Sequence, residues 1–464
     1  MDRNSIHYEE AREGVLLTQH HPRNELHRFT EIPARTSLVD CGARTLRIRL
    51  HRLLAVLQIC DQFFQAKPNY LKMYARNYSH AEMVDILRNI SIEAEQTILT
   101  CRVNGVRCKQ LFTETVTDEG ICFTFNGYSS YDMFRDGVLH DEYRYLNGRK
   151  NITNWSQDAG FVTGKSYESY PIRALGSGFE AGLSMRLMMA DTDVEEHCRE
   201  QQGFKIILHS PREYPQARKR FILVSYSQDV TLAVRPIIYK TSSELSSYPP
   251  KRRNCFFNHE RPLKFFRIYS QSNCELECVT NFTLKSCGCV KFSMPRSKGT
   301  RVCQTSEIAC VILAENKMLK RAATNRLKKL QSLYTACDCI PGCNSIQYDA
   351  EITQTKCDFK KTLELRLGPE DPAIGEALAA RQISKLAIYF KDTQFITLKR
   401  SELFGTTDFI ADCGGILGLC LGVSLFSLVE LLYYCMVRPV FMVRDSLRNK
   451  RTVTVVKEKD KGRY

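Results

Sequence analysis

The sequence predicts a membrane protein with an α+β, disulfide-rich extracellular domain and one evident transmembrane helix near its C-terminus. Three observations support this fold class. An uncharged apolar run lies near the C-terminus, basic residues follow it, and cysteines are concentrated ahead of it. Sixteen of the 20 cysteines lie between Cys60 and Cys357. Such cysteine use is typical of proteins that fold in an oxidising compartment and are held together by disulfides.

The apolar run lies within residues 407–437. No residue from Cys413 to Val429 carries a charge, and Asp412 and Glu430 frame this stretch. With its flanks the run reaches the roughly 20 residues that span a bilayer as a helix. A carboxylate so close to hydrocarbon is costly and usually faces water or a partner. Two interpretations remain open: a plain anchor whose acids reach the surface, and a pore-lining helix with acidic rings.

Glycines recur at every fourth position of this run, so that one helical face is small and can approach another helix closely. They are Gly414, Gly418 and Gly422.

The charges around the run predict its orientation. Residues 438–464 hold nine Lys or Arg against three acids, and basic flanks stay in the cytoplasm. Five N-x-S/T glycosylation sequons precede the run, which agrees with an extracellular location for this part of the chain. They are Asn77, Asn89, Asn151, Asn154 and Asn281.

These observations predict four regions. Residues 1–52 form an N-terminal cytoplasmic segment, 53–403 the cysteine-rich extracellular domain, 404–437 the transmembrane helix and 438–464 a basic cytoplasmic tail. The first fifty residues contain no apolar core of a secretory signal. The apolar stretch Leu53–Cys60 is too short to span a membrane and follows Arg47, Arg49 and Arg52. We therefore expect no first transmembrane helix in this sequence.

Periodicity predicts the elements of the extracellular region. An amphipathic pattern predicts a helix over His80–Thr97, and a basic helix is expected over Asn316–Tyr334. The alternating run Lys385–Lys399 is expected to form one strand that leads into the membrane helix. Short β-rich runs predict further strands. They are Gly182–Met189, Phe204–His209, Phe221–Ser225 and Thr231–Ile238.

Ten cysteines between Cys255 and Cys343 flank the basic helix, and their spacing allows a nested ladder of disulfides. Each bridge would stabilise a segment with little core of its own by about 2–4 kcal/mol. Cys-x-Cys and Cys-x3-Cys pairs could instead bind zinc. The predicted extracellular location favours disulfides, and we expect no metal site and no cofactor.

Other function classes find little support. The net charge is 66 − 51 = +15, of which the tail supplies 9 − 3 = +6. We expect no nucleic-acid partner, because the sequence has neither a basic-aromatic repeat nor zinc-finger spacing. We also expect no enzyme, because H-E-x-x-H, G-x-S-x-G and P-loop patterns are absent.

Three motifs together resemble the degenerin/epithelial sodium channel superfamily. They are CFTFN at 122–126, the ten-cysteine array at 255–343, and ADCGGILGLCLGVSLFSLVE at 411–430. The runs PPKRRNC, LKFFRIYSQSNCELEC and SCGCVKFSMP are most similar to the arthropod pickpocket branch. The resemblance covers about residues 100–437. It implies an extracellular domain of palm, β-ball, finger, thumb and knuckle on transmembrane helices.

The resemblance also implies a function. It suggests a homo- or hetero-trimer of related subunits in the plasma membrane, multi-pass in its full-length form. Such a trimer is a ligand- or stimulus-gated channel that conducts sodium as its permeant ion and is blocked by amiloride-type compounds. The alternative is a single-span, disulfide-rich cell-surface glycoprotein without channel activity.

The resemblance implies roles for residues of the apolar run. Gly422, Val423 and Ser424 would form the selectivity filter. Asp412 would lie at the pore mouth beside Ala411, the degenerin position, where a small residue is expected. Glu430 would lie at the inner end of the pore.

The resemblance implies seven disulfides. The pairs are Cys101–Cys108, Cys60–Cys122, Cys255–Cys343, Cys274–Cys339, Cys278–Cys337, Cys287–Cys310 and Cys289–Cys303. It assigns no partner to Cys198 and Cys357, and it leaves free thiols at Cys413, Cys420 and Cys435.

Overall fold

The computed structural model describes residues 14–19, 55–56, 58–59, 83–140, 155–157, 160–161, 170–190, 202–327, 337–359, 361–362, 381–422 and 424–448. The chain divides into two compact units, Met1–Arg400 and Ser401–Tyr464.

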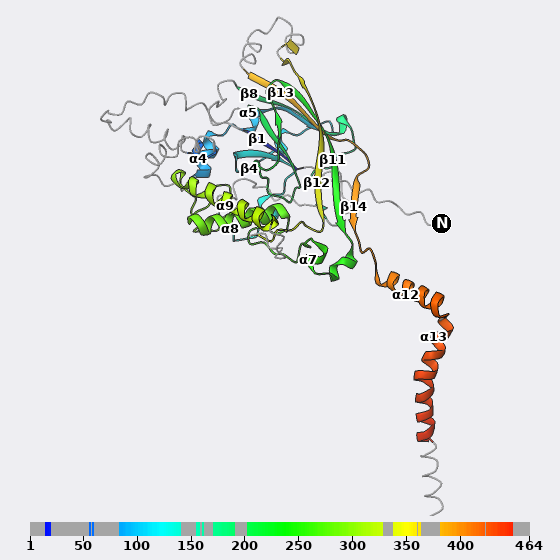
Figure 1. Ribbon diagram of the computed structural model, residues 1–464. Coiled ribbons are helices and arrows are strands. Elements are labelled where there is room, and N and C mark those ends of the chain that lie inside the picture. Colours follow the sequence, from blue (N-terminus) through cyan, green and yellow to red (C-terminus); the bar gives the residue numbers. More distant parts are fainter. Residues whose placement is uncertain are drawn as a thin grey trace, which may run out of the picture. The chain divides into compact units, whose positions relative to one another are not determined.

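The larger sheet of the first unit has the strand order β12-β11-β13-β8-β2-β3, and β14 also pairs with β11 (Figure 1). Its central strand β11 alternates buried and half-buried residues, which is the period of a strand with one face on the core. Val230, Leu232 and Val234 are fully buried on that face. The strands are β2 (Ile98–Val103), β3 (Val106–Arg107), β8 (Leu183–Ala190), β11 (Gln228–Thr241), β12 (Ser345–Lys356), β13 (Arg381–Phe390) and β14 (Ile396–Arg400).

The predicted single strand Lys385–Lys399 is wrong. Residues Lys385–Phe390 of β13 run parallel to the first half of β11, and Ile396–Arg400 run parallel to its second half. Between them the chain leaves the sheet, and Arg235 of β11 holds Asp392 of this excursion at 3.0 Å.

The smaller sheet has the order β10-β9-β1-β5-β4. Every residue of β5 is buried, because β1 and β4 pair with its two edges. Residues Gly14–Gln19 form β1, whereas the sequence analysis placed them in a cytoplasmic segment. Pairing with both β5 and β9 puts this stretch in the same domain as the cysteine-rich region. The strands are β1 (Gly14–Gln19), β4 (Thr113–Thr117), β5 (Gly120–Phe125), β9 (Phe204–His209) and β10 (Ile222–Val224).

Short elements complete the first unit. A two-stranded sheet joins β6 (Trp155–Ser156) and β7 (Gly160–Phe161). The helices are α4 (Met83–Ile90), α5 (Ala94–Thr97), α6 (Ser130–Met133), α7 (Pro250–Arg253), α8 (Gln271–Cys287) and α9 (Ile308–Leu327). Single 3-10 turns lie at Lys109–Leu111, Phe179–Ala181, Ser243–Ser247 and Thr305–Glu307.

Helix α8 was not predicted, because its buried face is largely polar. Asn273, Glu277, Thr280 and Thr283 are all buried, so apolar periodicity is missing. The Glu277 carboxylate instead accepts the backbone N–H groups of Lys264 and Phe265, at 2.8 and 2.9 Å. A helix can therefore dock through hydrogen bonds that no hydrophobic pattern reveals.

Two predicted helices have different limits. The helix expected over His80–Thr97 is interrupted after α4, where the Ser91 hydroxyl bonds the Leu87 carbonyl at 2.6 Å and competes with the helical ladder. The basic helix begins at Ile308, eight residues earlier than predicted, and its expected end lies outside the described residues.

Disulfides brace α8, α9 and the chain around them. Cys287–Cys310 joins the two helices directly, and Cys274–Cys339 and Cys278–Cys337 join α8 to the chain beyond α9. Cys101–Cys108, Cys255–Cys343 and Cys289–Cys303 are also present. These are six of the pairs that the resemblance implied. The proposed zinc alternative does not hold at the Cys-x-Cys pair, because Cys289 and Cys287 each bond another cysteine.

The seventh implied disulfide is a correction. Cys122 carries a free, fully buried thiol, while Cys60 lies outside the described residues. The Cys122 thiol lies 2.9 Å from the Thr117 hydroxyl of the neighbouring strand, and burial raises its pKa well above the usual value. Of the remaining cysteines, Cys357 is also free.

Two of the predicted glycosylation sites are described, and both side chains are exposed. Asn89 lies on α4 and Asn281 on α8. The other three, Asn77, Asn151 and Asn154, lie outside the described residues.

The apolar stretch Leu53–Cys60 belongs to the folded domain where it is described. Ala55, Val56 and Ile59 are buried against α4 and the β4–β5 hairpin. The Gln58 side chain donates to the Cys303 carbonyl at 3.3 Å. This short segment therefore packs into the first unit, as expected of a run too short to span a membrane.

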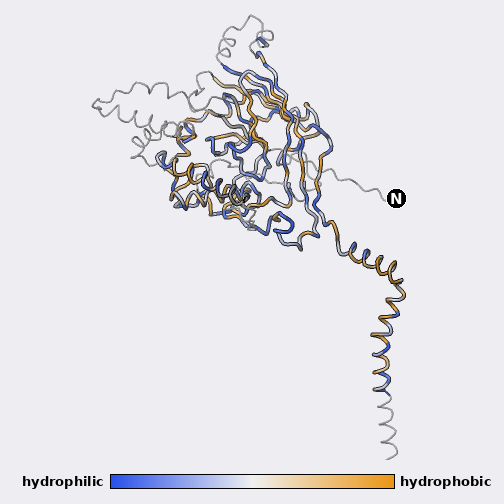
Figure 2. The backbone as a smooth tube through the Cα atoms, in the orientation of Figure 1, coloured by the Kyte–Doolittle hydropathy of each residue, from blue (hydrophilic) through white to orange (hydrophobic). Residues whose placement is uncertain are grey.

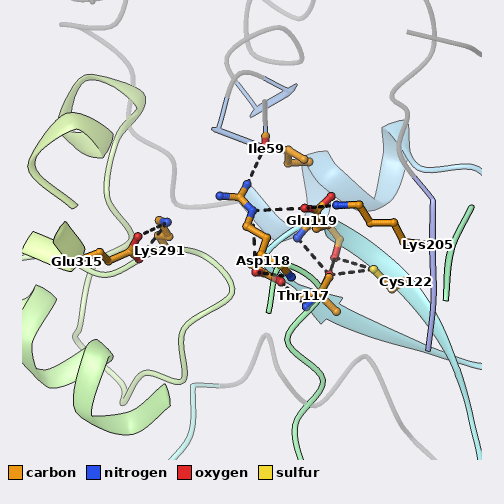
Figure 3. Close-up of polar contacts among 11 residues, drawn as sticks. Ile59, Thr117, Asp118, Glu119, Cys122, Lys205, Lys291 and Glu315 are labelled. Carbon is orange, nitrogen blue, oxygen red and sulfur yellow. Dashed lines mark hydrogen bonds and ion pairs between the residues drawn. The ribbon is translucent and has the colours of Figure 1, made fainter. Parts of the chain in front are cut away.

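A chain of charged side chains links this segment to the sheet (Figure 3). Lys205 of β9 pairs with Glu119 of the β4–β5 hairpin at 2.9 Å, and their side chains are 3% and 0% exposed. Arg218 lies 3.4 Å from Glu119 and donates to the Ile59 carbonyl at 2.8 Å. The Asp118 carboxylate accepts the backbone N–H of Ala217 at 2.9 Å. Strand β9, the β4–β5 hairpin, the segment around Ile59 and the loop at residues 217–218 are therefore held together by buried and part-buried polar contacts.

Burial shifts the pKa values of groups in the loop between β9 and β10. It also shifts the pKa of Asp118, the hairpin residue that accepts a hydrogen bond from this loop. Desolvation raises the pKa of Asp118, although backbone N–H groups oppose it, and lowers the pKa of Arg218. Desolvation also raises the pKa of Glu213 to about 7, against the attraction of Arg212 and Lys219.

We predict that Glu119→Gln lowers the free energy of unfolding by about 3–5 kcal/mol, because it leaves the buried Lys205 without its counter-charge. The unfolding midpoint of the detergent-solubilised chain measures this. Glu351→Gln is the control: it breaks the exposed pair with Lys391 and should cost less than about 1 kcal/mol. Equal losses of unfolding free energy in the two variants would contradict a stabilising role for the buried Lys205–Glu119 pair.

We predict a pH dependence of stability from Glu213. Its folded-state pKa of about 7 exceeds the usual value of 4.5 for a glutamate side chain. The folded state therefore binds the proton more tightly, and this contribution is complete below pH 4.5 and lost as the pH rises to 7. Unfolding midpoints measured across this range should show a fall that Glu213→Gln flattens. A variant with an unchanged profile would refute the prediction.

Candidate functional site

The second unit begins with a helix that carries an acid in its first turn. Helix α12 (Thr406–Leu421) starts after Gly405, whose N–H donates to the Asp408 carboxylate at 3.0 Å. The negative side chain satisfies an otherwise free N–H and complements the positive end of the helix dipole. This cap fixes where the helix starts.

Helix α12 ends at Gly422, inside the apolar run. Gly422 has φ 65° and ψ 18°, the left-handed conformation that side chains disfavour, and its N–H returns to the Gly418 carbonyl at 3.0 Å. Gly422 is the first residue of the selectivity filter that the family resemblance implied. Val423 lies outside the described residues.

The chain becomes helical again at Ser424, which caps α13 (Leu425–Leu432). The Ser424 hydroxyl accepts the Ser427 N–H at 3.3 Å, and the Ser427 hydroxyl lies 3.4 Å from the Ser424 nitrogen. Sequence reasoning missed Ser427. The signal was present, because serines three residues apart before an apolar run form a reciprocal cap.

The break leaves backbone groups available to a ligand. The last carbonyls of a helix have no partner within it, and the C-terminal end of α12 is the negative end of its dipole. Among them the Gly418 and Leu417 carbonyls are taken by the Gly422 N–H. Oxygens of this kind can replace the water around a cation.

The two predicted acids lie on opposite sides of the break. Asp412 and Ala411 are exposed on α12, and Glu430 is exposed on α13. At about 1.5 Å per residue, Asp412 lies some 15 Å along the helix from Gly422. The helix break is therefore framed by one exposed carboxylate on each side along the chain.

Residues 404–437, expected to form the transmembrane helix, hold two helices and not one continuous helix. The break divides the apolar run, and the 16 residues of α12 reach only about 24 Å, less than the roughly 30 Å of a bilayer core. Within the described part, one helix is long and apolar enough to cross a membrane, Phe426–Arg448. It continues eleven residues into the predicted cytoplasmic tail and contains a π-helical turn at Tyr433–Val437.

Helices α12 and α13 are largely apolar in sequence (Figure 2), and no residue of α12 is buried by the described part of the chain. Leu419 is 89% exposed and Phe426 80% exposed. So large an apolar surface requires lipid or other protein chains around it. The thiols of Cys413, Cys420 and Cys435 are free, as expected.

This sequence is similar to a pickpocket protein and to two proteins named as ion channels. Pickpocket protein 28 of Drosophila melanogaster is 28% identical over 393 residues, which cover 83% of this chain and 62% of the relative. Sodium channel protein Nach of the same fly is 24% identical, covering 78% and 61%. Human acid-sensing ion channel 2 is 24% identical, covering 88% and 69%. The chain therefore spans about three-fifths of the length of the two fly relatives.

A family model confirms the resemblance. The model described as amiloride-sensitive sodium channel matches residues 8–434, nearly the whole chain. The match includes the cysteine-rich unit and the helix break at Gly422. The fold class predicted from the sequence, a disulfide-rich α+β domain followed by an apolar helix, agrees with this family. The chain belongs to the amiloride-sensitive sodium channel family.

Proposed function

We propose that this chain is a subunit of a trimeric, stimulus-gated, amiloride-sensitive channel that conducts sodium across the plasma membrane. The observation that carries the proposal is the helix break at Gly422–Ser424, between Asp412 and Glu430. Membership of the amiloride-sensitive sodium channel family supports it. The fly relatives are longer than this chain. That this chain has the activity of a whole channel subunit is therefore part of the proposal.

The break suits ion selection for a physical reason. Three copies around an axis would bring the C-terminal carbonyls of three α12 helices, with three Ser424 hydroxyls, into one ring. Ordered oxygens of this kind replace a cation's hydration water without paying to reorient a flexible chain. The Ser424–Ser427 cap fixes the residue that follows the break, so the ring would have a defined geometry.

The carboxylates suit ion supply. Three Asp412 side chains at one end of the pore would raise the local cation concentration and repel anions. The partners in this arrangement are copies of the chain or related subunits, membrane lipid around the outer helix faces, and a blocker of the amiloride type within the pore.

The alternative is a cell-surface glycoprotein that uses this unit only as an anchor. Exposed Asn89 and Asn281 and the braced α8–α9 pair suit such a role. An anchor gains nothing from a left-handed residue and a serine cap within its apolar run. It would tolerate a restored helix.

We predict that Gly422→Ala alters sodium permeation, because a methyl group at φ 65° costs about 1–2 kcal/mol and favours a continuous helix. Gly415→Ala is the matched control, since Gly415 lies in α12 and an added methyl meets nothing within 4 Å. Sodium-to-potassium selectivity of currents from the chain, expressed alone and with a pickpocket-type subunit, measures the effect. Identical selectivity in both variants and the parent would favour the anchor.

We predict that Asp412→Asn lowers the sodium current several-fold at low ionic strength and less at high salt, where exposed charges are screened. Asp445→Asn provides the control, because Asp445 lies 33 residues further along than Asp412, beyond α13. Single-channel recordings at two salt concentrations test this. A loss that is independent of salt would count against cation concentration by Asp412.

A further inference from the structure

A small cavity lies where the β4–β5 hairpin, α6 and the end of β9 meet. The space that water centres can occupy is about 30 Å³. Thr115, Thr124, Tyr128, Ser130 and His209 contribute polar groups to its lining. All five residues are buried except Ser130, which is partly exposed.

His209 presents a hydrogen-bond acceptor to this cavity. Its Nδ1 lies 2.9 Å from the Ser210 carbonyl oxygen, which can only accept, so Nδ1 carries the hydrogen. Burial lowers the pKa of His209 to about 4, so the ring is neutral at pH 7 and Nε2 holds a lone pair. Within the described part of the chain, this buried Nε2 has no hydrogen-bond partner.

Ser130 presents a second polar atom. Its hydroxyl oxygen is buried and has no hydrogen-bond partner among the described residues. The hydroxyl does not reach His209 directly, although both residues line the same cavity. Buried polar atoms are nearly always satisfied in folded proteins, by protein or by ordered water.

The chemistry of the lining restricts the guest. The guest must donate a hydrogen to Nε2, which an ordinary anion cannot do. Among the described residues, neither a carboxylate nor a thiol lines the cavity, so a metal ion would find one nitrogen and no charge. The available space exceeds the roughly 10–15 Å³ that one water needs and is too small for a drug-sized ligand.

We propose that this cavity is a hydration site in which one or two water molecules bridge His209 Nε2 and the Ser130 hydroxyl. A bridging water donates to the ring nitrogen and accepts from the hydroxyl. It thereby ties the first turn of α6 to the end of β9. The loop that follows β9 is held by α8, because the Tyr214 N–H donates to the Asn273 side-chain oxygen at 2.9 Å.

Two measurements on the full chain in detergent test the proposal. A density map that resolves ordered water should show a peak within hydrogen-bond distance of both atoms. Ser130→Ala should lower the unfolding midpoint by about 2–4 °C, because it breaks the bridge and leaves Nε2 poorly satisfied. Ser247→Ala, an exposed serine with one local bond to the Glu244 carbonyl, should change it far less.

A dry cavity predicts the opposite sign. Ser130→Ala would then remove an unsatisfied buried hydroxyl, and the midpoint would stay the same or rise. Either that result or a map without the peak overturns the proposal. His209→Phe adds a second check: it should displace the water and erase the peak while the Ser130 side chain remains.

Discussion

The hydrogen bonding of β11 is the constraint on which the first unit depends. From Gln228 to Tyr239 this strand pairs with β12 on one edge, and on the other edge it pairs with β13 and then with β14. Because each backbone N–H and C=O needs a partner, the register of one long strand positions three others. The same register sets the last residue of the unit, since β14 ends at Arg400 and residues 401–405 lead to α12.

Buried polar groups set the remaining contacts between elements. Helix α8 docks through Glu277 and Asn273, and the β4–β5 hairpin docks through Asp118 and Glu119. Such contacts are directional, and leaving one partner unpaired is costly, so they specify one arrangement more sharply than apolar contact does. The disulfides around α8 and α9 then tie these helices to each other and to the chain beyond α9.

In the second unit the decisive feature is the interruption of a helix. An unbroken helix satisfies its own backbone, whereas this unit ends one helix at Gly422 and caps the next at Ser424, between two acids. The interruption weakens the unit as a bare anchor, and that cost is why its presence argues for conduction. The charge network and the hydration site act elsewhere, within the first unit, and hold its sheets and helices in place.

The sequence by itself determined the features that are local or carried by the family resemblance. These include the cysteine pairs of the 255–343 array and the apolar run with its framing acids. Tertiary structure decided what depends on distant partners. Residues 14–19 became a strand only because β5 and β9 flank them. Helix α8 could bury polar side chains only because partners elsewhere bond them: the backbone N–H groups of Lys264 and Phe265 donate to the Glu277 carboxylate. Cys122 stayed a thiol beside Thr117, and β13 and β14 separated around Asp392. Periodicity reports one face of one segment, whereas hydrogen bonds and ion pairs between segments appear only when both partners are in place.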